Sequence, residues 1–238
     1  MTGMSKPVLS SIVKMDPRPC KWNIYDVCMV MLIMIGTQII GYKLLHLTKA
    51  NEIVHDLVDA FLHMILGVAP LGWVWLFRKA TPRDLGFRRG HWSIAKGTGI
   101  AAVTGMCCGN AFLALEGKIV SIVITIILIL RTIVITPGSP ALLALWVLAP
   151  VSEEILDRGF LYAYLRPRIG VTLGLLLQAA ICGVCHWTKL DQYPTMFVMA
   201  LVFGLLYELS GSLYPSIICH SLYNMTVVAI TAASKLGL

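Results

Sequence analysis

Charged side chains are scarce in this 238-residue chain: only 13% of its residues are Asp, Glu, Lys or Arg, whereas 58% are apolar. Soluble globular domains carry about 25% charged and about 45–50% apolar residues. Because so few polar side chains cannot cover a globule in water, an ordinary soluble domain is excluded and a bilayer is the predicted environment. At about 20 residues per span, no sizeable soluble domain fits beside the membrane helices.

A cleavable signal peptide is also lacking. The first 22 residues are polar and basic, with no apolar core before a small-residue cleavage site. The first membrane helix is therefore expected to serve as the insertion signal. Repeats, low-complexity tracts and linkers are missing as well, so residues 1–238 are predicted to form a single integral membrane domain.

A disulfide framework is not expected, because the number of cysteines, seven, is odd and most of them lie in apolar runs. Cys182, Cys185 and His186 have the C-x-x-C-H spacing of a covalent haem site. That stretch lies inside an apolar run, and no methionine stands out as an axial ligand. Small polarizable side chains packed between helices are the favoured interpretation.

Eight apolar runs predict an all-α fold, a polytopic membrane bundle of about eight transmembrane helices. The runs cover residues 24–46, 55–77, 93–115, 119–136, 141–165, 171–188, 194–210 and 213–235. The fourth run is the weakest, because Arg131 interrupts it after 12 apolar residues. If this run spans the membrane, Arg166 and Arg168 fall outside, against the positive-inside rule, and if it does not, they fall inside.

The net charge of +7 would suggest a nucleic-acid partner for a soluble protein. In a membrane protein it indicates basic cytoplasmic loops that face anionic lipid, so membrane lipid is the expected partner and nucleic acid is not. The loop over residues 78–91 holds five cations against Asp84 alone. This asymmetry predicts a cytoplasmic N-terminus and loop, in the cell (inner) membrane. No oligomeric state is predicted.

Three carboxylates and an arginine lie near the middle of the apolar run 141–165: Glu153, Glu154, Asp157 and Arg158. Each charge at the bilayer centre costs about 2.5–3.5 kcal/mol, so the four need a compensating arrangement. Helical spacing puts Glu154 and Arg158 on one face, where they can pair, and leaves Glu153 without a local cation. Because apolar surroundings make a carboxylate a stronger base, Glu153 is a candidate to take a proton from water. A purely structural ion-pair cluster is the alternative.

His220 and Asn224 lie four residues apart in the last apolar run, so they share a helix face. Two hydrogen-bonding groups at this spacing can converge on one developing oxyanion. The alternative is that they form interhelical hydrogen bonds that only hold helices together. His186 is unremarkable by itself. The joint presence of glutamates, a histidine and a His-x-x-x-Asn pair on three helices favours an active site.

The order E-E-x-x-x-R-G, an isolated histidine about 30 residues later, and G-S-L-Y-P-S-I-I-x-H-x-x-x-N resembles the CPBP or Abi family of intramembrane proteases, which includes the type II CAAX prenyl endopeptidases. The resemblance covers residues 150–224 and implies a catalytic four-helix core over residues 141–235. Residues 84–88 are faintly similar to a loop common in the family. By position, the resemblance implies that the catalytic residues are Glu153, Glu154, Arg158, His186, His220 and Asn224.

Two positions depart from the family pattern. The residue before the arginine is usually aromatic and is Asp157 here, and the position four residues before His186 is usually Phe and is Cys182 here. Neither change removes a catalytic group. Asp157 adds negative charge beside Glu153 or offers contact to a basic substrate residue. Both changes suggest a divergent branch with its own substrate, so prenylated CAAX proteins are not assumed.

The sequence therefore predicts an intramembrane endopeptidase that hydrolyses a peptide bond of a membrane-associated protein or peptide. Glu153, assisted by His186, activates water, His220 and Asn224 stabilise the oxyanion, and no cofactor is required. A zinc protease is the alternative, with one glutamate, His186 and His220 as ligands and water in the fourth place. The H-E-x-x-H motif is absent, and Asn224 is a poor zinc ligand but suits an oxyanion hole, so the metal-free mechanism is favoured.

Functions outside catalysis are the remaining alternatives. The polar residues could line an ion or proton path, but a transporter more often shows paired broken helices in two related halves. A noncatalytic bacteriocin-immunity or scaffold protein in the membrane also stays open, because immunity can itself depend on proteolysis.

Overall fold

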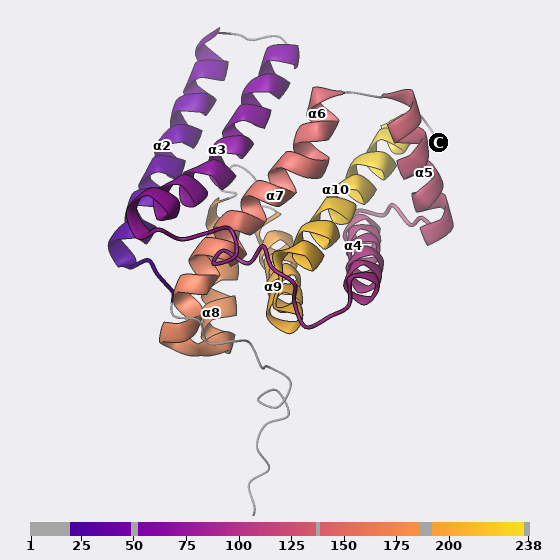
Figure 1. Ribbon diagram of the computed structural model, residues 1–238. Coiled ribbons are helices and arrows are strands. Elements are labelled where there is room, and N and C mark those ends of the chain that lie inside the picture. The colour runs from indigo at the N-terminus through magenta and orange to yellow at the C-terminus, as the bar shows by residue number, and fades with distance from the viewer. Residues whose placement is uncertain (1–19, 49–51, 137–138, 186–191, 236–238) are drawn as a thin grey trace, which may run out of the picture.

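The computed structural model describes residues 20–48, 52–136, 139–185 and 192–235. Helices are the only regular secondary structure in these ranges, which confirms the all-α prediction (Figure 1). The elements are α2 (Ile24–Thr48), α3 (Glu52–Arg78), α4 (Ile94–Leu115), α5 (Ile122–Ile135), α6 (Pro140–Leu143), η1 (Ala144–Leu148), α7 (Ala149–Glu154), η2 (Ile155–Tyr162), α8 (Ala163–Cys185), α9 (Tyr193–Ser210) and α10 (Leu213–Lys235).

Five helical stretches within the described residues are long and apolar enough to cross a membrane: Ile24–Gly41, Ile94–Leu115, Ala144–Cys185, Tyr193–Ser210 and Leu213–Lys235. Two shorter apolar helices, Met64–Arg78 and Ile122–Ile135, lie beside them. The protein is thus an integral membrane helix bundle, whereas the predicted number of about eight spans is not confirmed. The weak fourth run forms α5, whose 14 residues are fewer than the roughly 20 that a span needs.

The stretch Ala144–Cys185 covers most of two predicted runs, 141–165 and 171–188, and reverses direction between them. Gly170 has a φ of 81°, a left-handed value that glycine adopts readily, and Pro167 precedes it. After this turn Gly174 packs against Tyr162 so closely that a Cβ on Gly174 would lie 3.1 Å from the tyrosine ring. The second half of α8 therefore runs antiparallel to η2.

The helix that carries the charged cluster is widened in two places into π-helix, at η1 and at η2. Pro150 follows η1 and has no N–H to donate, so the normal i to i−4 ladder cannot continue through it. π-Helical turns shift the side chains that follow and are frequent at functional sites. Here the second such turn contains Asp157 and Arg158.

Small residues let α4 lie directly against α10. Gly97, Ala101, Gly105 and Gly109 recur every four residues on the buried face of α4. A Cβ on Gly105 would lie 2.4 Å from the carbonyl oxygen of Cys219, so the two backbones touch there. Figure 1 shows this pair on one side of the bundle, with α2 and α3 on the other and the α6–α7 helix between them.

Candidate active site

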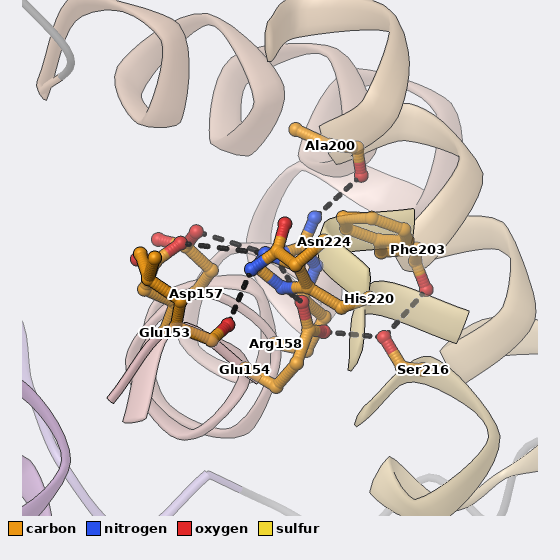
Figure 2. A network of polar contacts seen from close by, with 10 residues as sticks. Glu153, Glu154, Asp157, Arg158, Ala200, Phe203, Ser216, His220 and Asn224 are labelled. Carbon is orange, nitrogen blue, oxygen red and sulfur yellow. Dashed lines mark hydrogen bonds and ion pairs between the residues drawn. The ribbon is translucent and has the colours of Figure 1, made fainter. Parts of the chain in front are cut away.

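The charged cluster lies inside the bundle, where α7 and η2 face α9 and α10 (Figure 2). Glu154 has no exposed surface, and Arg158 and Asp157 are 1% and 6% exposed. Glu153 is the most accessible member of the cluster, with 18% of its side chain exposed. The two glutamates of the pair therefore have different surroundings although they are neighbours in sequence.

Arg158 is held by acceptors on three sides. Its Nη1 donates to Oε1 of Glu154 at 3.0 Å and to Oδ2 of Asp157 at 3.2 Å, and its Nη2 donates to the carbonyl oxygen of Ala200 at 2.8 Å. The guanidinium also lies over the ring of Phe203, 5.3 Å from its centroid. Glu154 and Arg158 form the ion pair predicted from their i, i+4 spacing. Arg158 is also hydrogen-bonded to the backbone of α9.

Glu154 links its own helix to α10 through its two oxygens. Oε1 contacts Arg158 and Nδ1 of His220, the latter at 3.0 Å, while Oε2 accepts a short hydrogen bond from the hydroxyl of Ser216. Each lone-pair direction of a buried carboxylate that finds a donor offsets part of its desolvation cost. Glu154 therefore organises the site and has little access to a substrate.

His220 lies between the two glutamates. Its ring stacks on Phe203 with centroids 4.5 Å apart, and Nδ1 is occupied by Glu154. Nε2 points toward Glu153, 3.8 Å from its Oε2, which is longer than a direct hydrogen bond. Nε2 and the partly exposed Glu153 carboxylate therefore lie beside each other on this side of the ring.

Asn224 lies one helical turn beyond His220, as its spacing predicts. Its Nδ2 donates to the carbonyl oxygen of Leu145 in η1 at 2.9 Å, and a primary amide carries a second N–H besides this one. The contact with Leu145 links α10 to the widened turn that precedes the glutamates.

The remaining predicted residue, His186, lies outside the described residues. Cys182, one turn earlier on α8, is described: it is buried and shares a side-chain hydrogen bond with Asp157. The two positions at which the chain departs from the family pattern are thus in contact with each other.

Ser216 and Phe203 belong to the site although the sequence reasoning did not select them. Ser216 precedes His220 by four residues, and so it lies on the same helix face as His220 and Asn224. That spacing was a signal available in the sequence. Phe203 carried no such signal, because one aromatic residue in an apolar helix indicates nothing beyond packing.

The loop over residues 84–91 supports the site from one end. A Cβ on Gly159, the residue after Arg158, would lie 2.6 Å from the carbonyl oxygen of Leu85, so only glycine fits there. The loop also pairs with the α9–α10 turn, since the N–H of Leu213 donates to the carbonyl of Gly86 at 3.0 Å and that of His91 donates to the carbonyl of Ser210 at 2.6 Å.

Asp84, the first residue of this loop, accepts hydrogen bonds from Thr81 and Lys21. Partial burial raises the pKa of Asp84, but hydrogen bonds from Thr81 and Lys21 outweigh that effect and hold the pKa below the usual carboxyl value. The Lys21 ammonium lies 2.9 Å from Oδ2 of Asp84. The carboxylate therefore stays charged at neutral pH and holds the loop to the segment that precedes α2.

The ligand set for zinc is only partly described. No group of three or more His, Cys, Asp or Glu side chains within the described ranges is arranged to hold a metal ion. Glu153 and His220 would be two ligands of the zinc hypothesis, and the third, His186, falls outside these ranges. Nδ1 of His220 and both oxygens of Glu154 are already occupied by protein partners.

Comparison with known proteins identifies the segment that contains this cluster. A search of curated proteins and a search of solved structures gave no match. Residues 135–226 match the family model described as type II CAAX prenyl endopeptidase Rce1-like. The match spans every described residue of the cluster and confirms the resemblance carried by the motifs: the segment 135–226 is Rce1-like, which is consistent with a CPBP-family protease.

Proposed function

We propose that the chain is an intramembrane endopeptidase in which Glu153 activates the attacking water. The observation that carries this proposal is the asymmetry of the glutamate pair around His220. Glu154 is fully buried and occupied, whereas Glu153 keeps exposed surface and faces Nε2 of the same imidazole at 3.8 Å. A base that must receive a proton from water needs this access.

The hydrolysis follows from these positions. Glu153 takes a proton from a water molecule as its oxygen attacks the carbonyl carbon of the scissile peptide bond, and the carbonyl becomes an oxyanion. Donors from Nε2 of His220 and the second N–H of Asn224 stabilise that charge. The tetrahedral intermediate then collapses, the carbon–nitrogen bond breaks, and the proton held by Glu153 passes to the departing amine.

Glu154 and Arg158 act as positioning residues in this scheme. The Glu154 carboxylate, 3.0 Å from Nδ1, fixes the orientation of the His220 ring. Arg158 offsets the negative charge of the buried carboxylates. His186 enters only by resemblance, as an assistant to Glu153.

The substrate in this proposal is a protein or peptide held in the membrane. Lipid-modified C-termini, peptide precursors and membrane-anchored sorting tails all present a peptide bond near the bilayer. The Asp157–Cys182 contact replaces side chains that are usually aromatic in the family, which supports a substrate different from a prenylated CAAX protein.

A comparison of membrane proteomes tests the proposal. Cells producing the natural chain are compared with cells producing Glu153→Gln and, as a matched control, Glu116→Gln, which changes an exposed carboxylate at the end of α4. The expected result is at least one membrane-protein fragment that forms with the natural chain and Glu116→Gln and is absent with Glu153→Gln. The same fragments in all three would overturn the proposal and favour a noncatalytic immunity or scaffold role.

A further inference from the structure

Polar side chains also gather where η2 faces α8. Asp157 and Cys182 share a hydrogen bond there, and Glu153 precedes Asp157 by four residues, about one helical turn. Gln178 lies one turn before Cys182 on α8, on the same helix face. The three residues form a polar strip (Gln178, Cys182 and Asp157) that leads along α8 and η2 to Glu153.

Gln178 is the unusual member of the strip. It is 0% exposed, and neither its amide oxygen nor its amide nitrogen has a hydrogen-bonding partner among the described residues. Its Oε1 is directed at α9, 3.4 Å from where a Cβ would stand on Gly204. Nε of Arg158, 1% exposed, also lacks a partner within the described part of the chain.

The side chains of Arg158 and Gln178 lie against neighbouring turns of α9. Arg158 donates through Nη2 to the carbonyl of Ala200, and Gln178 abuts Gly204, one turn further along. The side chains between them are small, since Ala179 and Ala200 are buried there. Buried donors and acceptors without protein partners are normally satisfied by ordered water, which needs two to four polar partners. Gln178, Arg158 and Asp157 supply that number.

We propose that Gln178, Cys182 and Asp157 line an internal hydrated path that brings water to Glu153. The proposal rests on the proposed function, for which it names the source of the consumed reactant. Each peptide bond cleaved uses one water molecule, and the surrounding helices are apolar. A polar strip that ends at Glu153 can deliver a new water molecule after each cleavage. The face occupied by His220 and Ser216 does not have to open for this.

The reactivity of the Cys182 thiol tests the path directly. The probe is a small, charged, water-soluble methanethiosulfonate, which reacts with hydrated thiolate and not with a thiol in a dry apolar contact. The other six cysteines are replaced by serine or alanine, and Glu153→Gln is included so that proteolysis plays no part. A second protein keeps Cys219 alone, a fully buried thiol on α10, as the dry reference.

Cys182 is expected to react at least about tenfold faster than Cys219. Equal rates would overturn the proposal, and this comparison needs no change at Gln178. Gln178→Leu, which removes both amide groups at similar volume, is expected to slow Cys182 labelling about tenfold, while Gln178→Asn stays within about threefold of the parent. Gln38→Leu, on α2, is the matched control and leaves the labelling rate unchanged. Undiminished labelling in Gln178→Leu would overturn the proposal.

Catalysis gives a second measurement. In the protein with Glu153 intact, Gln178→Leu is expected to lower kcat and leave KM and the melting temperature as they were, because the change affects water and not the bound peptide. A Gln178→Leu protein with a lower melting temperature and unaltered kcat would overturn the proposal and indicate a structural amide. Since the labelling comparison does not depend on proteolysis, failure of the proposed function and failure of the path are distinguishable.

Discussion

Nδ1 of His220 lies 3.0 Å from Oε1 of Glu154, so the second glutamate of the pair, and not the first, holds the histidine. Glu153 is left on the Nε2 side of the ring, at 3.8 Å. One imidazole thus separates a buried, fully occupied carboxylate from an accessible one. The two glutamates are expected to respond differently to the same substitution.

Glu154→Ala is expected to destabilise the fold by about 3–5 kcal/mol, because it leaves the buried Arg158 without its main partner and removes the acceptor for Ser216. Thermal unfolding in detergent measures the change. Glu116→Ala is the control. Glu116 is exposed and, within the described part of the chain, its ion pair is with Lys118, so the melting temperature is expected to change as little as for an ordinary surface substitution. A Glu154→Ala protein as stable as this control would show that Glu154 does not hold the site together.

His220→Ala and Asn224→Ala are each expected to lower kcat by about 10²–10³, because each removes one donor to the oxyanion. KM is expected to change little. Asn110→Ala is the matched control for the asparagine, since Asn110 also donates from a helix to a backbone carbonyl, that of Met106, away from the site. Equal loss of activity in Asn110→Ala and Asn224→Ala would show that the amide acts only on folding.

Hydropathy alone predicted most of the helices of the core. The run 213–235 coincides with α10. The run 194–210 ends with α9 and starts one residue later than that helix does. The E-E-x-x-x-R spacing predicted the pairing of Glu154 with Arg158, because i, i+4 neighbours meet on any helix. Local periodicity decides these features, and no tertiary contact is needed to foresee them.

The remaining features depend on contacts between distant segments. The π-helical turns change the direction of side chains by an amount that sequence periodicity does not encode. The tie from Arg158 to the carbonyl of Ala200 has no side-chain signature, because any residue offers that acceptor.

Gly159→Ala is expected to destabilise the fold by about 1–3 kcal/mol, because its new methyl group would meet the carbonyl oxygen of Leu85 at 2.6 Å and push the loop away from the site. The control is Gly99→Ala, at which nothing lies within 4 Å of the added Cβ. That change is expected to be neutral or to stabilise α4 by up to about 1 kcal/mol. Melting temperatures of the two variants in the same detergent separate these effects. Equal melting temperatures would show that contact with the loop is not the reason for a glycine at position 159.

Chelation separates the two mechanisms proposed for the site. With glutamate-activated water, proteolysis is expected to persist after the purified protein is treated with a strong zinc chelator, and elemental analysis is expected to find zinc well below one atom per chain. Loss of activity on chelation, restored by added zinc, would contradict this mechanism and support Glu153 and His220 as ligands. His220→Asn then serves as a further check, because it keeps a hydrogen-bond donor but weakens a zinc site.

Several of the described cations lie at one end of the bundle. Arg88 donates to the carbonyl of Gly211, Arg168 donates to that of Trp22, and Arg166 pairs with Glu208, so the loop after α3, the start of α2 and the turns beside α8 and α9 lie together. Arg166 and Arg168 thus share this end with the basic loop, which is the arrangement expected if α5, with its 14 residues, does not span the membrane. The positive-inside rule then predicts that the whole end is cytoplasmic.

Labelling from the two sides of the membrane tests this orientation. In a protein whose native cysteines are replaced, Arg89→Cys is expected to react with a membrane-impermeant thiol reagent in inverted vesicles and to be protected in intact cells. Lys118→Cys is the matched position, because α4 starts at the basic end and its 22 residues rise about 33 Å to the opposite side. It is expected to show the reverse pattern. If both cysteines react from the same side, α4 does not cross the bilayer, and if the two patterns are exchanged, the basic end faces away from the cytoplasm.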